Sequence, residues 1–190
     1  MEAFNKFLQQ FPNYTPKVFE NVRPYLSIKH LKTEAYFLQH GKICRDIAFI
    51  EKGFLRLFYL NDGKEITNCF CRENTITTAY SSLISSTESD LAIQATEPTK
   101  LIVFSYDSLK KMYEQDMFWQ QLGRLASESE YITTECHSRF LRDLTATERY
   151  KQILVTDYEL LQRVSLKHLS TYLQVSPETL SRIRKKISRT

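Results

Sequence analysis

The fold is decided by residues 47–70, whose sequence is IAFIEKGFLRLFYLNDGKEITNCF. Branched and aromatic side chains dominate residues 54–60, and this composition is typical of a β-strand. Asn61-Asp62-Gly63-Lys64 follows directly, and an Asp-Gly pair between two apolar runs is a strong hairpin signal. Residues 65–70 then alternate between polar and apolar, so they are predicted to form the returning strand.

Further strands extend this unit over residues 26–105. Three of the four glycines fall between residues 41 and 63, a spacing typical of tight turns between short strands. We expect later strands at 90–95 and 100–104, joined by a turn at Glu97-Pro98. Residues 2–11 precede the unit as a short predicted helix, because four apolar side chains fall on one helical face: Phe4, Phe7, Leu8 and Phe11.

The hydrophobic period changes after Ser105, and the sequence becomes helical. A first helical piece is predicted over 107–117. A heptad seam follows, with gaps of four and three between its members: Phe118, Leu122, Leu125, Ser129, Ile132 and Cys136. A helix of about 25 residues is about 37 Å long, too long for so small a β unit to cover. We therefore expect it to pair with its copy in a homodimer, the alternative being a helix packed within one subunit.

The C-terminal residues 165–186, SLKHLSTYLQVSPETLSRIRKK, predict two short helices around a tight turn. Ser165 and Ser176 are suited to cap the two helices, and Pro177 suits the first position of the second. A capping box at 145–148 begins a new helix upstream and marks the best domain boundary. The pattern predicts a helix-turn-helix, although an ordinary helical hairpin has the same length.

Charge separates the two ends of the chain. Residues 163–190 carry a net charge of +6, whereas the remaining 162 residues carry −2. This distribution favours a polyanionic partner that meets only the C-terminal end, and a solvated basic tail is the alternative. Duplex DNA fits the outward residues of the second helix, which would reach bases first and phosphates later: Ser176, Pro177, Glu178, Thr179, Ser181, Arg182, Lys185 and Lys186.

With these motifs in this order, the chain resembles the Crp–Fnr family of bacterial transcription regulators, in particular its short forms. The resemblance rests on Gly41 with residues 47–57 and 62–65, and on residues 175–183. It implies an α+β fold with three parts: an antiparallel β-roll of the double-stranded β-helix type as sensor domain over 1–106, a dimerisation helix over 107–143, and an all-α helix-turn-helix domain over 144–190. Because the chain stops soon after the recognition helix, we expect that domain to lack a full wing.

The resemblance also implies roles for single residues. Glu178 and Arg182 would contact base edges, because a glutamate can accept a hydrogen bond from cytosine N4 and an arginine can donate two hydrogen bonds to guanine O6 and N7. Family members often carry another arginine just before that glutamate, where this chain has Pro177, so its operator preference should differ. The implied partners are double-stranded DNA, a second copy of the chain, a small-molecule effector and RNA polymerase.

Cyclic nucleotide binding is disfavoured, because the residues that hold the nucleotide in the family are incomplete here. A Gly-Glu pair would hold the ribose, but no glycine precedes Glu73, and residues 73–99 contain no Lys or Arg. Burying a phosphodiester without a countercharge costs several kcal/mol. We therefore expect a neutral or different ligand, or none, unless Arg124 or Arg139 reaches in. The residues matching the family pocket are Glu73, Asn74, Ser81, Ser82, Ser89 and Asp90.

Several other classes of protein are excluded. The chain has no apolar run long enough to span a membrane and no basic start followed by an apolar run. Its four cysteines contain no CxxC pair, which favours reduced thiols in the cytoplasm. The scattered cysteines and histidines predict no metal, haem or iron–sulfur site, and without a nucleophile–base pair we expect no enzyme. The alternative function is a protein that binds a cyclic nucleotide or another small ligand in signalling or protein interaction, without specific DNA binding.

Overall fold

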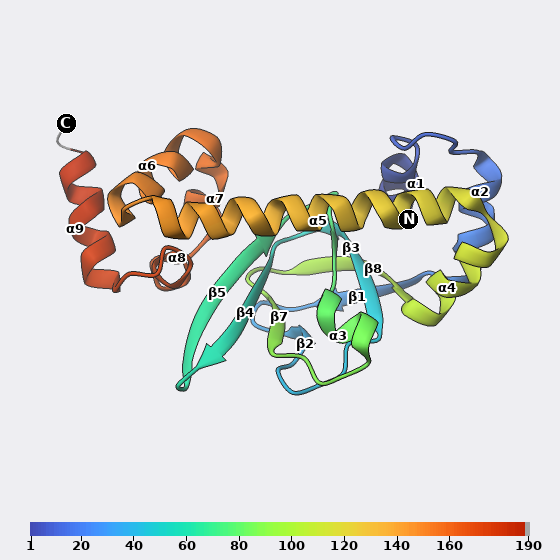
Figure 1. Ribbon diagram of the computed structural model, residues 1–190, viewed down its shortest axis with the longest axis horizontal. Coiled ribbons are helices and arrows are strands. Elements are labelled where there is room, and N and C mark those ends of the chain that lie inside the picture. The colour runs from blue at the N-terminus through green and yellow to red at the C-terminus, as the bar shows by residue number, and fades with distance from the viewer. Residues whose placement is uncertain (189–190) are drawn as a thin grey trace.

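The computed structural model describes residues 1–188 and is organised along one long helix, α5 (Met117–Asp143) (Figure 1). A β-roll lies beside the middle of α5. The helices of the C-terminal end gather at one end of the molecule and those of the N-terminal end at the other. Arg189 and Thr190, the end of the predicted 144–190 domain, lie outside the described residues.

The strands form two antiparallel sheets of four strands each within residues 1–188. Their orders are β1-β8-β3-β6 and β2-β7-β4-β5. The strands are β1 (Ser27–Leu31), β2 (Tyr36–Leu38), β3 (Asp46–Lys52), β4 (Leu55–Asn61), β5 (Lys64–Cys71), β6 (Ile76–Thr77), β7 (Leu91–Ala95) and β8 (Thr99–Ser105).

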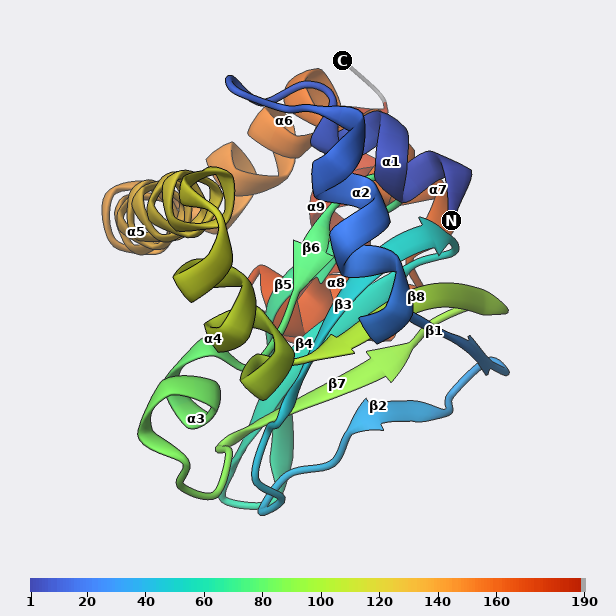
Figure 2. The same ribbon diagram turned by 90° about the vertical axis from the view of Figure 1, so that its right-hand side faces the viewer.

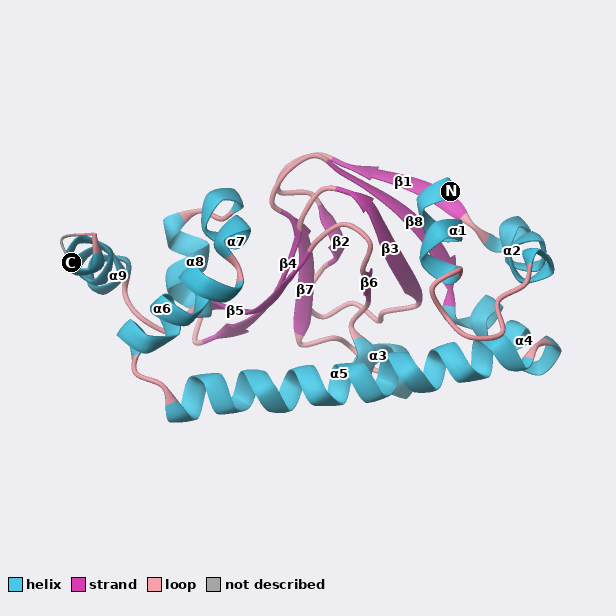
Figure 3. Ribbon diagram, turned by 90° about the horizontal axis from the view of Figure 1, so that it is seen from above, coloured by secondary structure: helices cyan, strands magenta, loops and turns pink. Residues whose placement is uncertain are grey.

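Helices cover both ends of this roll and one of its sides (Figures 2 and 3). In Figure 2, α3, α4 and α5 lie along the same side of the strands, and α4 continues from β8 into the start of α5. Besides α5, the helices are α1 (Glu2–Leu8), α2 (Pro16–Val22), a 3₁₀ turn (Arg23–Tyr25), α3 (Tyr80–Ser85), α4 (Tyr106–Gln115), α6 (Ala146–Thr156), α7 (Tyr158–Arg163), α8 (Leu166–Tyr172) and α9 (Pro177–Ile187).

The predicted hairpin is present between β4 and β5, with Asn61 paired to Lys64. Asp62 and Gly63 both have positive φ, 50° and 73°, as a two-residue turn of type I′ requires. The α+β class is confirmed, as are the antiparallel β-roll, the long helix that follows it and the helical C-terminal end. Helix α3 was not predicted, because its serine-rich sequence gains its order from tertiary bonds: Ser82 Oγ accepts from the Cys44 N–H and donates to the Thr87 carbonyl.

Two separate hydrophobic clusters stabilise the fold. The larger one joins both sheets to α1, α2 and the first turns of α5, where Phe118 and Trp119 are buried. The smaller one lies mainly within α6–α9 and includes the buried Phe54 of the β-roll segment, and Phe70 of β5 packs against it. The C-terminal helices therefore have their own core, to which these two β-roll side chains also contribute.

Gly53 sits in the turn between β3 and β4, where a side chain has no room. Its φ is +106°, and a Cβ built there would lie 2.4 Å from Thr99 Oγ1 and 2.6 Å from Thr99 Cα. Gly41 also has a positive φ, +75°, but a Cβ there would meet nothing within 4 Å. A side chain at Gly41 would therefore cause backbone strain alone, whereas a side chain at Gly53 would add a steric clash.

We expect Gly53→Ala to lower the free energy of unfolding by about 3 kcal/mol or more, since it adds overpacking to backbone strain. Gly41→Ala, which meets strain alone, should cost about 1–2 kcal/mol. Urea unfolding of both variants measures the difference. Equal losses would show that the contact with Thr99 does not constrain the turn.

Candidate nucleic-acid interface and ligand cavity

Helix α9 begins with the cap that the sequence predicted. The Ser176 hydroxyl accepts a hydrogen bond from the Thr179 N–H at 3.2 Å, and Pro177 occupies the first helical position. Leu180 and Ile183 point inward and are buried in the smaller cluster. This fixes which face of α9 points away from the molecule.

The outward face of α9 is exposed along its whole length. Arg184, which the sequence analysis did not select, is exposed with the predicted set and adds to its positive charge. The Ser176 hydroxyl holds the pKa of Glu178 below its ordinary value, so this carboxylate is ionised near neutral pH. The exposed set comprises all eight predicted residues: Ser176, Pro177, Glu178, Thr179, Ser181, Arg182, Lys185 and Lys186.

The turn between α8 and α9 is held from both sides. Gln174 takes a left-handed conformation with φ of 52°, a cost that non-glycine residues accept only where the surroundings impose it. The Val175 N–H donates to the Ser170 carbonyl at 3.0 Å, and Arg149 Nη1 of α6 donates to the Leu173 carbonyl at 2.7 Å. The angle between α8 and α9 is therefore determined by bonds to the rest of the helical domain.

Helix α8, not α9, packs against the β-roll. The hydroxyls of Thr67 in β5 and Thr171 in α8 lie 2.6 Å apart. The Phe70 ring of β5 lies 5.5 Å from the Tyr172 ring and 5.8 Å from the Phe54 ring, between centroids. The helix pair therefore contacts the β-roll through α8, and the outward face of α9 stays open to solvent.

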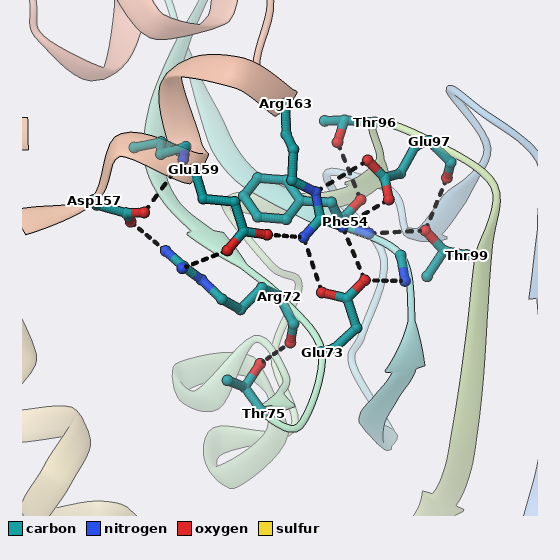
Figure 4. Close-up of polar contacts among 12 residues, drawn as sticks. Phe54, Arg72, Glu73, Thr75, Thr96, Glu97, Thr99, Asp157, Glu159 and Arg163 are labelled. Carbon is teal, nitrogen blue, oxygen red and sulfur yellow. Dashed lines mark hydrogen bonds and ion pairs between the residues drawn. The ribbon is translucent and has the colours of Figure 1, made fainter. Parts of the chain in front are cut away.

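Arg163, at the end of α7, connects the C-terminal helices to the β-roll through several ion pairs (Figure 4). Its guanidinium donates two bonds of 2.9 Å to the two oxygens of Glu73. It also reaches Glu97 at 2.7 Å and Glu159 at 2.7 Å. The same group lies 4.5 Å from the centroid of the Phe54 ring, in a cation–π arrangement. Three carboxylates and one ring thus surround a single cation.

This arrangement explains the titration of Glu73. The Arg163 hydrogen bonds, assisted by the Gly53 N–H at 2.8 Å, lower the pKa of Glu73 to about 2. The three carboxylates raise the pKa of Arg163. Next to this group, Arg72 pairs with Asp157 and, at 3.4 Å, with Glu159. Both carboxylate oxygens of Glu73 are therefore used in the contact between the β-roll and the C-terminal helices.

A cavity of about 830 Å³ lies between the β-roll and α5. The charged side chains in its lining within residues 1–188 are Arg124 and Glu130, both on exposed positions of α5. Arg124 already pairs with Glu128 at 2.7 Å. The lining also contains uncharged polar side chains: Asn74, Thr75, Thr77, Thr78, Tyr80, Tyr106, Tyr113, Gln120, Ser127 and Ser129. Apolar side chains make up most of the rest: Phe7, Phe11, Ile47, Leu57, Ile76, Leu83, Ile84, Phe104, Leu109, Trp119, Leu122 and Leu125.

The structure does not bring the residues predicted for the ligand pocket together around this cavity. Asn74 lines it, whereas Glu73 points to Arg163. Ser82 and Ser89 are buried in local bonds to the Thr87 and Leu91 carbonyls. Ser81 and Asp90 are exposed outside the lining. Of the two arginines considered, Arg124 reaches the cavity edge, and Arg139 lies in a different surface hollow.

Two cavity residues that the sequence analysis did not select for the pocket are Cys69 and Cys71 of β5. Their alternation with Phe70 is the signal that could have placed them there, because residues two apart on a strand face the same side.

The predicted seam of α5 divides into two halves. Phe118 and Leu122 are buried against their own β-roll, as a helix packed within one subunit requires. From Ser129 to Cys136 every residue is exposed, including Tyr131 and Ile132 with 72% and 59% of their surface accessible. The second half therefore presents large apolar side chains that the β-roll does not cover.

Neither a membrane-spanning helix nor a metal cluster occurs in the part of the chain that the structure describes. None of its helices is both long and apolar enough to cross a bilayer. No three His, Cys, Asp or Glu side chains among residues 1–188 gather in an arrangement that could bind a metal ion.

Comparison with known proteins relates the β-roll to a described domain. Residues 28–116 match the profile of the family described as "Cyclic nucleotide-binding domain". This segment holds every strand from β1 to β8 except the first residue of β1, together with α3 and α4. No curated protein matches the chain in sequence.

Solved structures share the fold over most of the chain. FixK2 from Bradyrhizobium japonicum superposes with a TM-score of 0.74 at 19% identity, covering 86% of this chain and 85% of its own. The c-di-GMP responsive global regulator CLP from Xanthomonas campestris gives 0.71 at 16% identity, covering 92% of each chain. A protein from Eubacterium rectale, assigned to the Crp/Fnr family of transcriptional regulators, gives 0.72 at 14% identity, covering 95% and 88%.

The ion pair between Glu73 and Arg163 predicts how the free energy of unfolding depends on pH. Because the pKa of Glu73 is lowered from 4.5 to about 2, its ion pair stabilises the folded state fully above pH 4.5. That contribution is lost as the pH falls from about 4.5 to about 2. We expect Glu73→Gln to cost about 1–3 kcal/mol at neutral pH and progressively less toward acid pH.

Urea unfolding of the wild type and the variant over this pH range measures the effect. Glu128→Gln is the matched control, since Glu128 also pairs with an arginine but on the exposed side of α5. Its effect should stay below about 0.5 kcal/mol. A Glu73→Gln loss that does not shrink in acid would contradict the assigned ion pair.

Proposed function

We propose that this chain is a sequence-specific DNA-binding transcription regulator of the Crp–Fnr type, which acts as a homodimer. In this proposal α8 and α9 form a helix-turn-helix and α9 enters the major groove. The β-roll is its sensor domain, and α5 joins two copies of the chain. The carrying observation is the solvent-exposed, cationic face of α9, presented by a helix pair whose back is docked on the β-roll.

The order of side chains along α9 supports DNA as the partner. Glu178 and Arg182, near the N-terminal half, are one helical turn apart and can contact neighbouring base edges. Lys185 follows near the C-terminal end, where the charge suits phosphates. Ser176 and Thr179 add short hydroxyl donors at the helix start. This arrangement matches the way recognition helices approach DNA, bases first and backbone after.

The exposed half of α5 supports the homodimer. Tyr131 and Ile132 lie on a surface that a second α5 would cover, and the helix of 27 residues is about 40 Å long. Ser129 interrupts the apolar seam once, so the pairing would be weaker there. Twofold symmetry about α5 would present two α9 helices together, as two successive major grooves about 34 Å apart require.

The cavity supports an effector that carries no net charge. A cyclic phosphate is best held by a positioned cation, and Arg124 is the one Lys or Arg of the lining among the described residues. It lies at the exposed edge and is already paired with Glu128. Glu73, the acid that could stand for the ribose contact, is bonded to Arg163. Largely apolar walls with uncharged polar side chains instead suit an uncharged molecule with a large apolar part and a few polar atoms.

Fluorescence anisotropy with duplexes selected from a random pool tests the proposal. A regulator should show affinity that depends on sequence and falls steeply as salt rises. A ligand-binding or interaction protein without specific DNA binding should show neither effect. Sedimentation measurements on the same sample would give the oligomeric state.

Two substitutions on α9 should act differently. We expect Arg182→Ala to reduce discrimination at one base pair of each half-site by about 1–3 kcal/mol, because the two hydrogen bonds from the arginine to a guanine are lost. Lys185→Ala should weaken binding to all sequences alike and lower the salt slope by about one. Anisotropy on the selected duplex and its single-base variants compares them. Identical behaviour of the two variants would contradict the division between base and phosphate contacts.

Cyclic AMP and cyclic GMP should leave the melting temperature unchanged. A ligand at 100 times its dissociation constant stabilises the folded state by about 2.7 kcal/mol, roughly 5–10 °C for a chain of this size. A thermal-shift series with both nucleotides and a panel of uncharged aromatic compounds measures this. A nucleotide shift that disappears in Arg124→Ala would show that Arg124 supplies the missing cation and overturn the assignment of an uncharged effector.

A further inference from the structure

Two cysteines lie side by side inside the cavity. Cys69 and Cys71 are two residues apart on β5, and both belong to the cavity lining. Between them, Phe70 packs against Tyr172 of α8 and against Phe54 of its own β-roll. One short segment of strand therefore has thiols in the cavity and an aromatic ring in the contact between the domains.

The two thiols lie on the same face of β5 and affect each other's ionisation. The neighbouring sulfur raises the pKa of Cys69 and lowers that of Cys71. The Thr77 hydroxyl, 3.6 Å from the Cys71 sulfur, also favours the thiolate, whereas burial and the charge of Glu130 oppose it. Cys71 is thus the more readily ionised thiol of the pair, and the thiolate is the nucleophilic form.

We propose that Cys69 and Cys71 form a redox pair that a hydroperoxide entering the cavity oxidises to an intramolecular disulfide. The Cys71 sulfur attacks the terminal peroxide oxygen, the O–O bond breaks, and the leaving alkoxide takes up a proton as an alcohol. Cys71 is then a sulfenic acid. The Cys69 sulfur attacks that sulfur, the S–S bond forms, and the S–O bond breaks with loss of water. Two thiols lose two electrons, and the peroxide gains them.

The cavity favours an organic hydroperoxide over hydrogen peroxide. Its volume of about 830 Å³ and its apolar walls suit a molecule with a hydrocarbon part, which would place the peroxide oxygen near β5. The other two cysteines lie elsewhere. Cys44 is buried outside the cavity lining, bonded to Thr78, and Cys136 lies on the exposed half of α5. They provide internal comparisons for reactivity.

Forming the disulfide must disturb the strand. Side chains two apart on one face of an extended strand are spaced about 6.6 Å apart along the backbone, whereas a disulfide needs Cβ atoms about 3.5–4.5 Å apart. The two Cβ atoms would have to approach by roughly 2–3 Å, and the residue between them that moves is Phe70. Oxidation would thereby loosen the docking of α8, and this consequence for DNA binding rests on the proposed function above.

The test treats the reduced, full-length protein with cumene hydroperoxide and, separately, with hydrogen peroxide. Peptide mass spectrometry should find a Cys69–Cys71 disulfide, formed faster with cumene hydroperoxide. In Cys71→Ser the oxidation of the remaining thiol should slow at least about tenfold. In Cys69→Ser a dimedone-reactive sulfenic acid should accumulate on Cys71. Cys44→Ser, whose thiol lies outside the cavity lining, is the control and should form the Cys69–Cys71 disulfide like the wild type.

A second readout follows the link to the C-terminal helices. Hydrogen exchange in β5 and α8 should become faster after oxidation, and anisotropy should show at least about fivefold weaker DNA binding. Oxidation confined to Cys136, or sulfenic acid formed equally in Cys71→Ser, would overturn the redox pair. A disulfide that leaves both exchange and DNA binding unchanged would overturn the coupling. If no duplex binds, the proposed function fails, whereas peptide mass spectrometry still tests whether the Cys69–Cys71 disulfide forms.

Discussion

The arrangement of this protein depends on the surroundings of one guanidinium group. Arg163 ends α7 and is held by Glu73, Glu97 and Glu159, with the Phe54 ring beside it. Glu73 and Glu97 come from the β-roll, so the C-terminal helices cannot leave it without separating a partly buried cation from its counterions. Such a separation costs more than the loss of an exposed ion pair, because burial weakens solvent screening.

Strand β5 connects the two regions to which we assign function. Phe70 and Thr67 contact Tyr172 and Thr171 of the C-terminal helices, whereas Cys69 and Cys71 line the cavity. The register shift of the β4–β5 pairing at Asn68 lets Thr67 and Phe70 both face the helices, whereas Cys69 and Cys71 face the cavity. The backbone is common to both sets of side chains. A change in the cavity that moves this backbone therefore reaches the helices directly. A ligand can shift the helices only by binding one of their arrangements more tightly than another.

The proposal of an uncharged effector rests on the same geometry. The acid that might have faced a ribose is used to hold Arg163, and the cation at the cavity edge is paired on the surface of α5. What remains is a largely apolar volume whose lining also holds uncharged polar side chains and two cysteines. The domain match describes the architecture of residues 28–116, while the chemistry of the lining belongs to this chain. The proposed effector follows from that lining.

Local signals in the amino-acid sequence were enough to predict several elements. The Asp62-Gly63 hairpin, the capping box that begins α6, and the Ser176-Pro177 start of α9 all depend on residues within one turn of each other. Which residues meet across the chain depends instead on how these elements pack. Glu73 and Arg163 are 90 positions apart, and nothing in the spacing of either predicts their bond. Likewise, half of the α5 seam became a core because the β-roll covers it, a fact of packing that periodicity cannot express.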